Sequence, residues 1–263
     1  MNSADGYKLR QAAEAGNAVA QRTLGDMYLR GTGVRRDPFK AAEWFLKAAE
    51  QGDESAQMNM GIMYLSGMGV IQDTAEAVKW FNRAEAHGGA ATFLMLGDMY
   101  EKGLVLGCDL TDAVRCYRKA SDLGIAKAQN HLGYMYTVGL GVEKNYAEAA
   151  RLFRLSADQG NAAGQFSMGM AYLHGIGLIR NPAEAAKWLR RSAEQEDPGA
   201  QFTLGTLYED GQGVRRDLAE AEKWYSKAAG HGVREAQERL RAMNSLGSKL
   251  KGGIKGLFGS LWN

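Results

Sequence analysis

Six glycines recur at intervals of 36 residues and constrain this chain more than any other feature. They are Gly25, Gly61, Gly97, Gly133, Gly169 and Gly205. Each follows a Leu or Met, and a Tyr stands three residues after each of them. A period of this length is typical of an array in which every unit buries its apolar face against the next one. The sequence therefore predicts a stack of repeats.

Charge and composition limit the function. The 263 residues contain 32 Lys and Arg against 30 Asp and Glu, a formal net charge of +2. Nucleic-acid-binding proteins usually concentrate positive charge on one face, so this near balance argues against that class. Apolar residues make up 45% of the chain, enough for a continuous core. We expect no nucleic-acid partner.

The cysteines and the N-terminal sequence bear on the compartment. Cys108 and Cys116 are eight residues apart, and the same length of helix spans about 12 Å, too far for an undistorted disulfide. We expect reduced thiols, which give no support for export. The first ten residues lack the basic and apolar regions of a signal peptide, and no apolar run reaches transmembrane length. We therefore expect a cytoplasmic chain, or a periplasmic or secreted one if a leader has been removed.

Each repeat is predicted to contain two helices, which we call helix A and helix B. Apolar residues recur at helical spacing over residues 18–30, which predicts helix A of the first repeat. Gly31 interrupts it, because Gly readily adopts the left-handed conformation that ends helices. Asp37 is the predicted N-cap of helix B, with Pro38 at its first position, and the helix stops at Gly52.

The ends of the array are predicted to be half-repeats. Residues 3–16 match a lone helix B and residues 234–244 match a lone helix A, and such units cap a stack. The predicted organisation is a solenoid over residues 1–244, with six 36-residue repeats between the caps. A Gly- and Lys-rich amphipathic tail over residues 245–263 follows it.

These motifs resemble a known family. The pattern A-x-x-x-L-G-x-x-Y-x-x-G-x-G-V-x-x-D-x-x-x-A-x-x-W-F-x-K-A-A-x-x-G stands almost in full over Ala20–Gly52. It resembles the Sel1-like repeat, a relative of the tetratricopeptide repeat with a longer Gly-rich loop, and the match covers roughly residues 3–244. The resemblance implies an all-α fold, an α/α right-handed superhelical solenoid. It also implies a non-enzymatic scaffold or adaptor for protein–protein interaction, of a kind found in bacteria.

Departures from the pattern are local. Thr92 replaces the usual Ala in the third repeat, and Glu196 stands where Gly is usual after the fifth. We expect the third repeat and the joint after the fifth to be less regular than the others.

A protein-binding surface is predicted from the helix A positions that the fold does not need. Positions equivalent to residues 22, 26, 29 and 30 vary between repeats and share one face of the helix. In the related tetratricopeptide repeat this face lines the inner, concave surface. The predicted protein-binding residues are Met58, Ile62, Leu94, Asn130, Tyr134, Val138, Phe166, Met170, His174 and Phe202.

The chemistry of this stripe favours a binding groove. A solvated face should be mostly charged, whereas this one is apolar or aromatic through much of the middle of the array. Large apolar patches usually mark interaction sites, and aromatic and Met side chains are favoured in them. The alternative is that a tight superhelix buries the stripe against its own neighbours.

The C-terminal tail leaves the repeat pattern. Five large apolar residues form one helical stripe, and they are Leu246, Leu250, Ile254, Leu257 and Leu261. Five glycines, at a cost of about 1 kcal/mol each, make an isolated helix marginal. Three interpretations remain open. The tail is a disordered remnant, or it docks onto a protein, including its own groove or a sister copy, or residues 246–263 insert into a membrane interface. The last defines the alternative function, a peripheral membrane-associated adaptor.

No catalytic, cofactor-binding or metal-binding motif stands out. His87 and His231 occupy the same repeat position at the end of helix B, where a cation complements the helix dipole. His131 and His174 have no set of acidic or Cys residues at metal-ligand spacing. The Gly-rich loops lack the Lys and Ser/Thr of a P-loop and follow a helix instead of a strand. We expect no enzyme activity, no cofactor and no metal.

Overall fold

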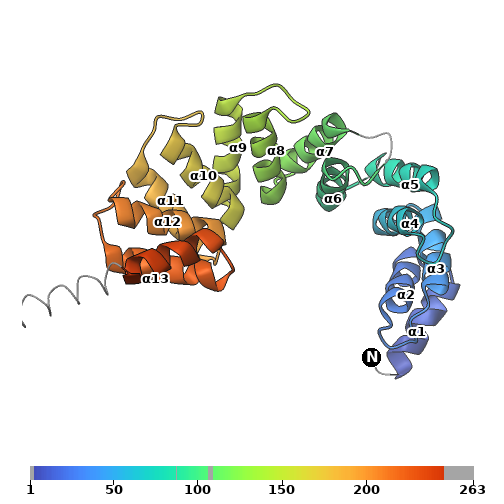
Figure 1. The fold of residues 1–263 in the computed structure, drawn as a ribbon. Coiled ribbons are helices and arrows are strands. Elements are labelled where there is room, and N and C mark those ends of the chain that lie inside the picture. Colours follow the sequence, from blue (N-terminus) through green and yellow to red (C-terminus); the bar gives the residue numbers. More distant parts are fainter. Residues whose placement is uncertain (1–2, 87, 106–108, 246–263) are drawn as a thin grey trace, which may run out of the picture. The chain divides into compact units, whose positions relative to one another are not determined.

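The computed structural model describes residues 3–86, 88–105 and 109–245, and every regular element in them is a helix. The helices are α1 (Ser3–Glu14), α2 (Ala18–Arg30), α3 (Pro38–Glu50), α4 (Glu54–Ser66), α5 (Thr74–Ala86), α6 (Ala90–Glu101), α7 (Leu110–Asp122), α8 (Ala126–Val138), α9 (Tyr146–Asp158), α10 (Ala162–His174), α11 (Pro182–Glu194), α12 (Pro198–Asp210) and α13 (Leu218–Gly230). Residues 234–245 are also helical. The even-numbered helices from α2 to α12 are the helices A, and each is followed by its helix B (Figure 1).

The chain divides into two compact units. The first unit is Met1–Ala128 with Leu140–Val142, and the second is Gln129–Gly139 with Glu143–Asn263. The first unit therefore contains α1 to α7, and the second contains most of α8 and all of α9 to α13. In the first unit α2, α4 and α6 each pack on the helix B that follows and on the helix before it, and in the second unit α10 and α12 do the same.

Helix boundaries fall where the sequence predicts them, because each has a local cause. Helix α2 spans Ala18–Arg30, and Gly31 after it has φ 75° with its N–H bonded to the Met27 carbonyl. Helix α3 begins at Pro38, and the Asp37 side chain caps it by accepting from the Lys40 backbone N–H at 3.1 Å. The predicted helix A, loop and helix B of the first repeat are thus confirmed.

The glycines of the 36-residue period allow helices A and B to lie in direct contact. A Cβ at Gly61 would lie 2.2 Å from the Phe81 ring, and one at Gly205 would lie 2.8 Å from the Tyr225 ring. Real Cβ atoms do not come this close to a ring, so any side chain would force the helices apart. This close approach explains why the helix A position is Gly in every repeat.

Each unit has its own core. The cores of both units combine small Ala residues of helix B with large side chains that fill the space between helices. In the first unit the buried cluster includes Ala41, Phe45, Ala48, Met60, Met63 and Trp80. In the second it includes Ala185, Leu189, Leu204, Ala221, Trp224 and Tyr225.

Buried glutamines form hydrogen bonds both to the preceding repeat and within their own repeat. The Gln21 amide donates to the Ala13 carbonyl at 3.0 Å, and Gln51 donates to Gln21 Oε1 at 2.6 Å. The second unit repeats the side-chain pair, with Gln195 donating to Gln165 Oε1 at 2.8 Å. These bonds satisfy polar groups that would otherwise be costly to bury.

The ends of the array are helical, and one joint is irregular. The predicted half-repeats correspond to α1 and to the helix over residues 234–245, while tail residues 246–263 lie outside the described residues. At the joint after the fifth repeat, Glu196 adopts φ 67°, where the equivalent Gly52 and Gly160 have φ 90° and 82°. A non-Gly residue in this region is strained, which agrees with the expected irregularity there.

Candidate protein-binding surface

In the second unit the predicted stripe begins on α8. Tyr134 and Val138 lie one turn apart on this helix, and the Tyr134 side chain is 50% exposed. Apolar side chains that are exposed to this extent can be buried only by a binding partner, and such burial is favourable. This pair is the most accessible apolar part of the stripe in the second unit.

The middle of the stripe is half-buried. Phe166 and Met170 of α10 and Phe202 of α12 all pack against the core of the second unit while keeping part of their surface exposed. Gly199 lies beside Phe166, since a Cβ there would be at an ordinary contact distance of 3.4 Å from the Phe166 ring. The Phe202 ring centroid lies 5.6 Å from that of Tyr225. Each of these residues therefore packs against the core with one part of its side chain and leaves another part exposed to solvent.

The polar members of the stripe lie at its margins. His174 is exposed in the last turn of α10. Asn130 of α8 is half-buried, and its Oδ1 is buried without a hydrogen-bond partner among the described residues. Leaving a buried acceptor without a hydrogen bond is unfavourable. Asn130 therefore places an unsatisfied polar group among the apolar side chains of α8.

In the first unit the stripe is less open. Ile62 of α4 is 37% exposed and Leu94 of α6 is half-buried, so a partner could contact both side chains. Met58, in contrast, is only 4% exposed. Neighbouring residues cover its side chain, so Met58 adds little to the accessible part of the predicted surface.

Charged stripe positions of the first unit are engaged by the chain itself. Arg22 Nε lies 3.1 Å from Asp53, the N-cap of α4. Asp98 of α6 lies 2.6 Å from the Lys127 ammonium. Exposed ion pairs of this kind contribute about 0–1 kcal/mol each, and a partner that covered them would have to desolvate both charges.

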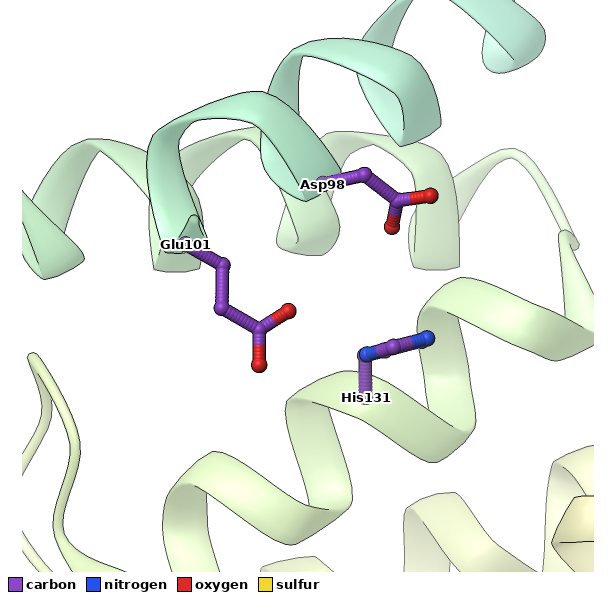
Figure 2. Close-up of side chains that lie close together, drawn as sticks. All are labelled: Asp98, Glu101 and His131. Carbon is purple, nitrogen blue, oxygen red and sulfur yellow. The ribbon is translucent and has the colours of Figure 1, made fainter. Parts of the chain in front are cut away.

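Asp98 also belongs to a buried contact that the sequence analysis missed. Figure 2 shows Asp98 and Glu101 on α6 with their carboxylates on one side of the helix, and it also labels His131, a residue of the second unit. The Tyr117 hydroxyl of α7 contacts Asp98 at 2.8 Å and Glu101 at 2.5 Å. Burial, followed by these two carboxylates, raises the pKa of Tyr117.

The second unit contains the equivalent contact. The Tyr225 hydroxyl donates to Glu209 at 2.6 Å and lies 3.2 Å from Thr206 Oγ1. Burial, with the Glu209 hydrogen bond, raises the pKa of Tyr225 to about 12. The signal is present in the sequence: Tyr occupies this helix B position only in the two repeats with Glu at the facing helix A position. The other four have Phe45, Phe81, Phe153 and Leu189 opposite Leu29, Leu65, Thr137 and Leu173.

Among the described residues, no helix is both long and apolar enough to cross a membrane.

The comparisons with known proteins identify the family. The Sel1 repeat matches six segments, which are residues 18–53, 54–89, 94–125, 126–161, 162–197 and 198–233. The chain belongs to the Sel1 repeat family. The third match begins only after Thr92, in agreement with the expected irregularity of that repeat. No match to a curated protein was found.

Solved structures support the same fold. A protective antigen present in uropathogenic Escherichia coli strains, with an SLR fold, is 39% identical over 88% of this chain, with a TM-score of 0.80. This chain covers only 50% of that antigen's length. A Sel1 repeat protein from Oxalobacter formigenes is 30% identical, with 88% of this chain and all of that chain covered and a TM-score of 0.70.

A more distant likeness concerns the fold alone. Yeast Tom70 is 13% identical, with 95% of this chain and 59% of that chain covered and a TM-score of 0.51. The predicted all-α solenoid of Sel1-like, tetratricopeptide-like repeats is confirmed. Folds of this type are generally protein–protein interaction scaffolds and are typically non-enzymatic.

Proposed function

We propose that the chain is a non-enzymatic scaffold that binds a segment of a partner protein along the helix A stripe of its second unit. This second-unit stripe consists of Asn130, Tyr134, Val138, Phe166, Met170, His174 and Phe202. One observation carries the proposal. These positions vary between repeats and stay partly exposed, whereas the repeated Gly and Leu or Met positions beside them are buried.

The chemistry of the stripe indicates the chemistry of the partner. Tyr134 and Val138 present apolar surface to solvent, while Phe166 and Met170 are partly seated in the core. Such a surface gains free energy by burying apolar side chains, about 25 cal/mol for each Å² removed from water. Aromatic and Met residues are favoured at such contacts. The expected partner segment therefore carries apolar or aromatic side chains at its contact points.

Affinity capture with paired variants tests the proposal. Tyr134→Asp combined with Val138→Asp places charge on the exposed part of the stripe, where the fold tolerates it. The matched control is Leu155→Asp, which changes an exposed apolar residue of α9 in the same unit. We expect the double variant to lose partners that the wild type and the control both retain, with unchanged helicity by circular dichroism. Equal capture by all three proteins would reject the stripe as the binding surface.

A further inference from the structure

The most exposed large apolar side chains of the described residues lie outside the stripe. Ile179 is 91% exposed in the loop between α10 and α11, a degree of exposure that packing does not explain. Tyr146 and Leu218, the first residues of α9 and α13, are about half exposed. All three lie where a helix A gives way to a helix B.

Contacts between repeats place these residues in one row. A Cβ at Gly177, in the loop that carries Ile179, would lie 1.9 Å from the Tyr146 carbonyl oxygen. The next loop repeats the arrangement, because a Cβ at Gly213 would lie 2.2 Å from the Pro182 carbonyl. Each loop thus rests on the start of the preceding helix B. Figure 1 shows the α10–α11 and α12–α13 loops on the same side of the second unit.

Four cationic residues belong to the same loops as these apolar residues. Lys144, Arg180, Arg215 and Arg216 are all exposed. Two are held in place by the loop itself, since Arg180 Nε donates to the Leu173 carbonyl at 3.0 Å and Arg216 Nε donates to the Glu209 carbonyl at 2.9 Å. These bonds hold the two arginine side chains against the C-terminal ends of α10 and α12.

The acidic residues of the edge offset this charge only in part. Glu143 is exposed next to Lys144. Asp217 is the N-cap of α13 and accepts from the backbone N–H groups of Ala219 and Glu220. Glu184, in the first turn of α11, pairs with Lys187 at 2.6 Å. Asp210, the last residue of α12, is exposed as well. The four cations, set against the three acids Glu143, Asp210 and Asp217, therefore leave the edge with a net charge of about +1.

The described chain also ends at this edge. Gln237 donates to the Ala229 carbonyl as Gln201 donates to the Ala193 carbonyl, so the helix over residues 234–245 has the register and direction of a helix A. Its C-terminal end therefore lies at the loop side of the unit. The 18 residues that follow contain three Lys and no Asp or Glu.

We propose that this loop edge docks onto the surface of an anionic lipid bilayer. The edge consists of Tyr146, Ile179 and Leu218 with Lys144, Arg180, Arg215 and Arg216. Single apolar side chains separated by cations do not form the continuous patch that buries a protein helix. They do match a bilayer interface, where apolar side chains enter between headgroups and cations face anionic phosphates.

This docking is independent of the proposed stripe. The stripe lies along the sides of α8, α10 and α12, whereas the edge lies at the ends of helices. A scaffold with both surfaces would hold its protein partner at a membrane.

Co-sedimentation of the full chain with vesicles tests the proposal. The probes are phosphatidylcholine vesicles with and without phosphatidylserine. We expect binding only with phosphatidylserine, with a decrease as salt rises because salt screens the cations. Ile179→Asp should lower the partition coefficient about tenfold, since it removes the most exposed apolar group and adds an anion. Arg215→Glu should lower it as well.

The control is Leu123→Asp. Leu123 is 56% exposed and follows the C-terminal end of α7, a helix B, so it does not lie at a loop edge. We expect this variant to bind vesicles like the wild type. Equal binding of the Ile179 and Leu123 variants would overturn the proposal, as would equal binding to both vesicle types.

A chain ending at residue 245 separates the edge from the tail. Among the described residues, the core clusters lie between Leu9 and Met243, so this chain keeps all of these cluster residues. We expect the truncated chain to bind the vesicles, and we expect Ile179→Asp in the truncated chain to weaken that binding. Loss of all binding on truncation, with Ile179→Asp neutral in the full chain, would assign binding to the tail alone. Loss of protein capture with unchanged vesicle binding in Ile179→Asp would assign the edge to a protein partner. Either outcome leaves the Tyr134 and Val138 test of the stripe intact.

Discussion

The first and second units present different chemistry at the same helix A positions. In the first unit Arg22 and Asp98 occupy the stripe, and each has an ion-pair partner from the neighbouring repeat. In the second unit the equivalent stripe positions include Tyr134, Phe166 and Met170, which stay partly exposed. The first unit thus carries paired charges at two stripe positions beside the apolar Ile62 and Leu94, whereas the second unit carries a mostly apolar, partly exposed stripe.

This difference separates what folds the array from what is left for a partner. The period positions, such as Gly61 with Phe81 and Gly205 with Tyr225, are equivalent in both units and hold helices A and B together. The stripe positions have no such constraint. Covering an ion pair costs desolvation, whereas covering an apolar side chain is favourable. Binding free energy is therefore expected mainly from the second unit.

The largest expected effect tests this contrast directly. Tyr134 and Ile62 occupy the same position of their repeats, and both are exposed. Once a partner is in hand, Tyr134→Asp should weaken its affinity by about tenfold or more, as truncation of an aromatic hot spot does. Ile62→Asp should change the affinity less than about twofold. Isothermal titration calorimetry measures both, and equal losses would show that the two units contribute alike.

A second comparison concerns the helix contact that both units share. At Gly61 a Cβ would lie 2.2 Å from the rigid Phe81 ring, whereas at Gly169 it would lie 2.6 Å from Cγ of the flexible Leu189. Gly61→Ala should therefore lower the free energy of unfolding by about 3 kcal/mol, and Gly169→Ala by about 1 kcal/mol. Urea denaturation measures both values.

The control for this comparison lies in α1. A Cβ at Gly6 would have no neighbour within 4 Å. Gly6→Ala should raise stability by about 0.5–1 kcal/mol, because Ala favours the helix more than Gly does. A smaller loss at Gly61 than at Gly169 would mean that the aromatic ring adapts more easily than the aliphatic side chain.

Most of the fold was predictable because its causes are local and repeated. The ends of α2 and α3 follow from Gly31, Asp37 and Pro38, and the same residue types recur every 36 residues. Even the irregular joint was visible, since Glu196 replaces a Gly and takes a left-handed conformation. Repetition turns a weak local signal into a strong one.

The candidate site was predictable only in outline, because exposure depends on neighbours that a single position does not report. Met58 and Ile62 both occupy variable stripe positions, yet the first is buried and the second exposed. The contact of Tyr117 with Glu101 could have been found by comparing facing positions across repeats. The exposure of Ile179 could not, because its loop position is Arg in two other repeats and Ile in one.

Tyr225 of the second unit, like Tyr117 of the first, is expected to make stability depend on pH. Its folded pKa is raised from 10.0 to about 12, so the folded state keeps the proton longer than the unfolded state. The resulting stability is present below pH 10 and is lost as pH rises toward 12. Tyr225→Phe should lower the free energy of unfolding by about 1 kcal/mol at neutral pH, with the difference shrinking above pH 10.

Urea denaturation at a series of pH values measures this dependence. Tyr208→Phe is the control, because its hydroxyl contacts Arg190 and, among the described residues, accepts from that cation instead of donating to a carboxylate. A difference between wild type and Tyr225→Phe that stays constant from neutral to alkaline pH would contradict the raised pKa.

The last expected effect concerns the glutamine pairs that join the two helices of one repeat. Gln51, Gln159 and Gln195 each donate to the buried Gln of their own repeat, but the position equivalent to them in the last repeat is His231. The buried Gln201 Oε1 consequently has no hydrogen-bond partner among the described residues. His231→Gln should supply the missing donor and raise the free energy of unfolding by about 1 kcal/mol. The reverse change, Gln195→His, should lower it by a similar amount, because it removes the donor to Gln165. If both changes proved neutral in urea denaturation, the glutamine pairs would not stabilise the contact between helices, and the cores of the two units would account for it alone.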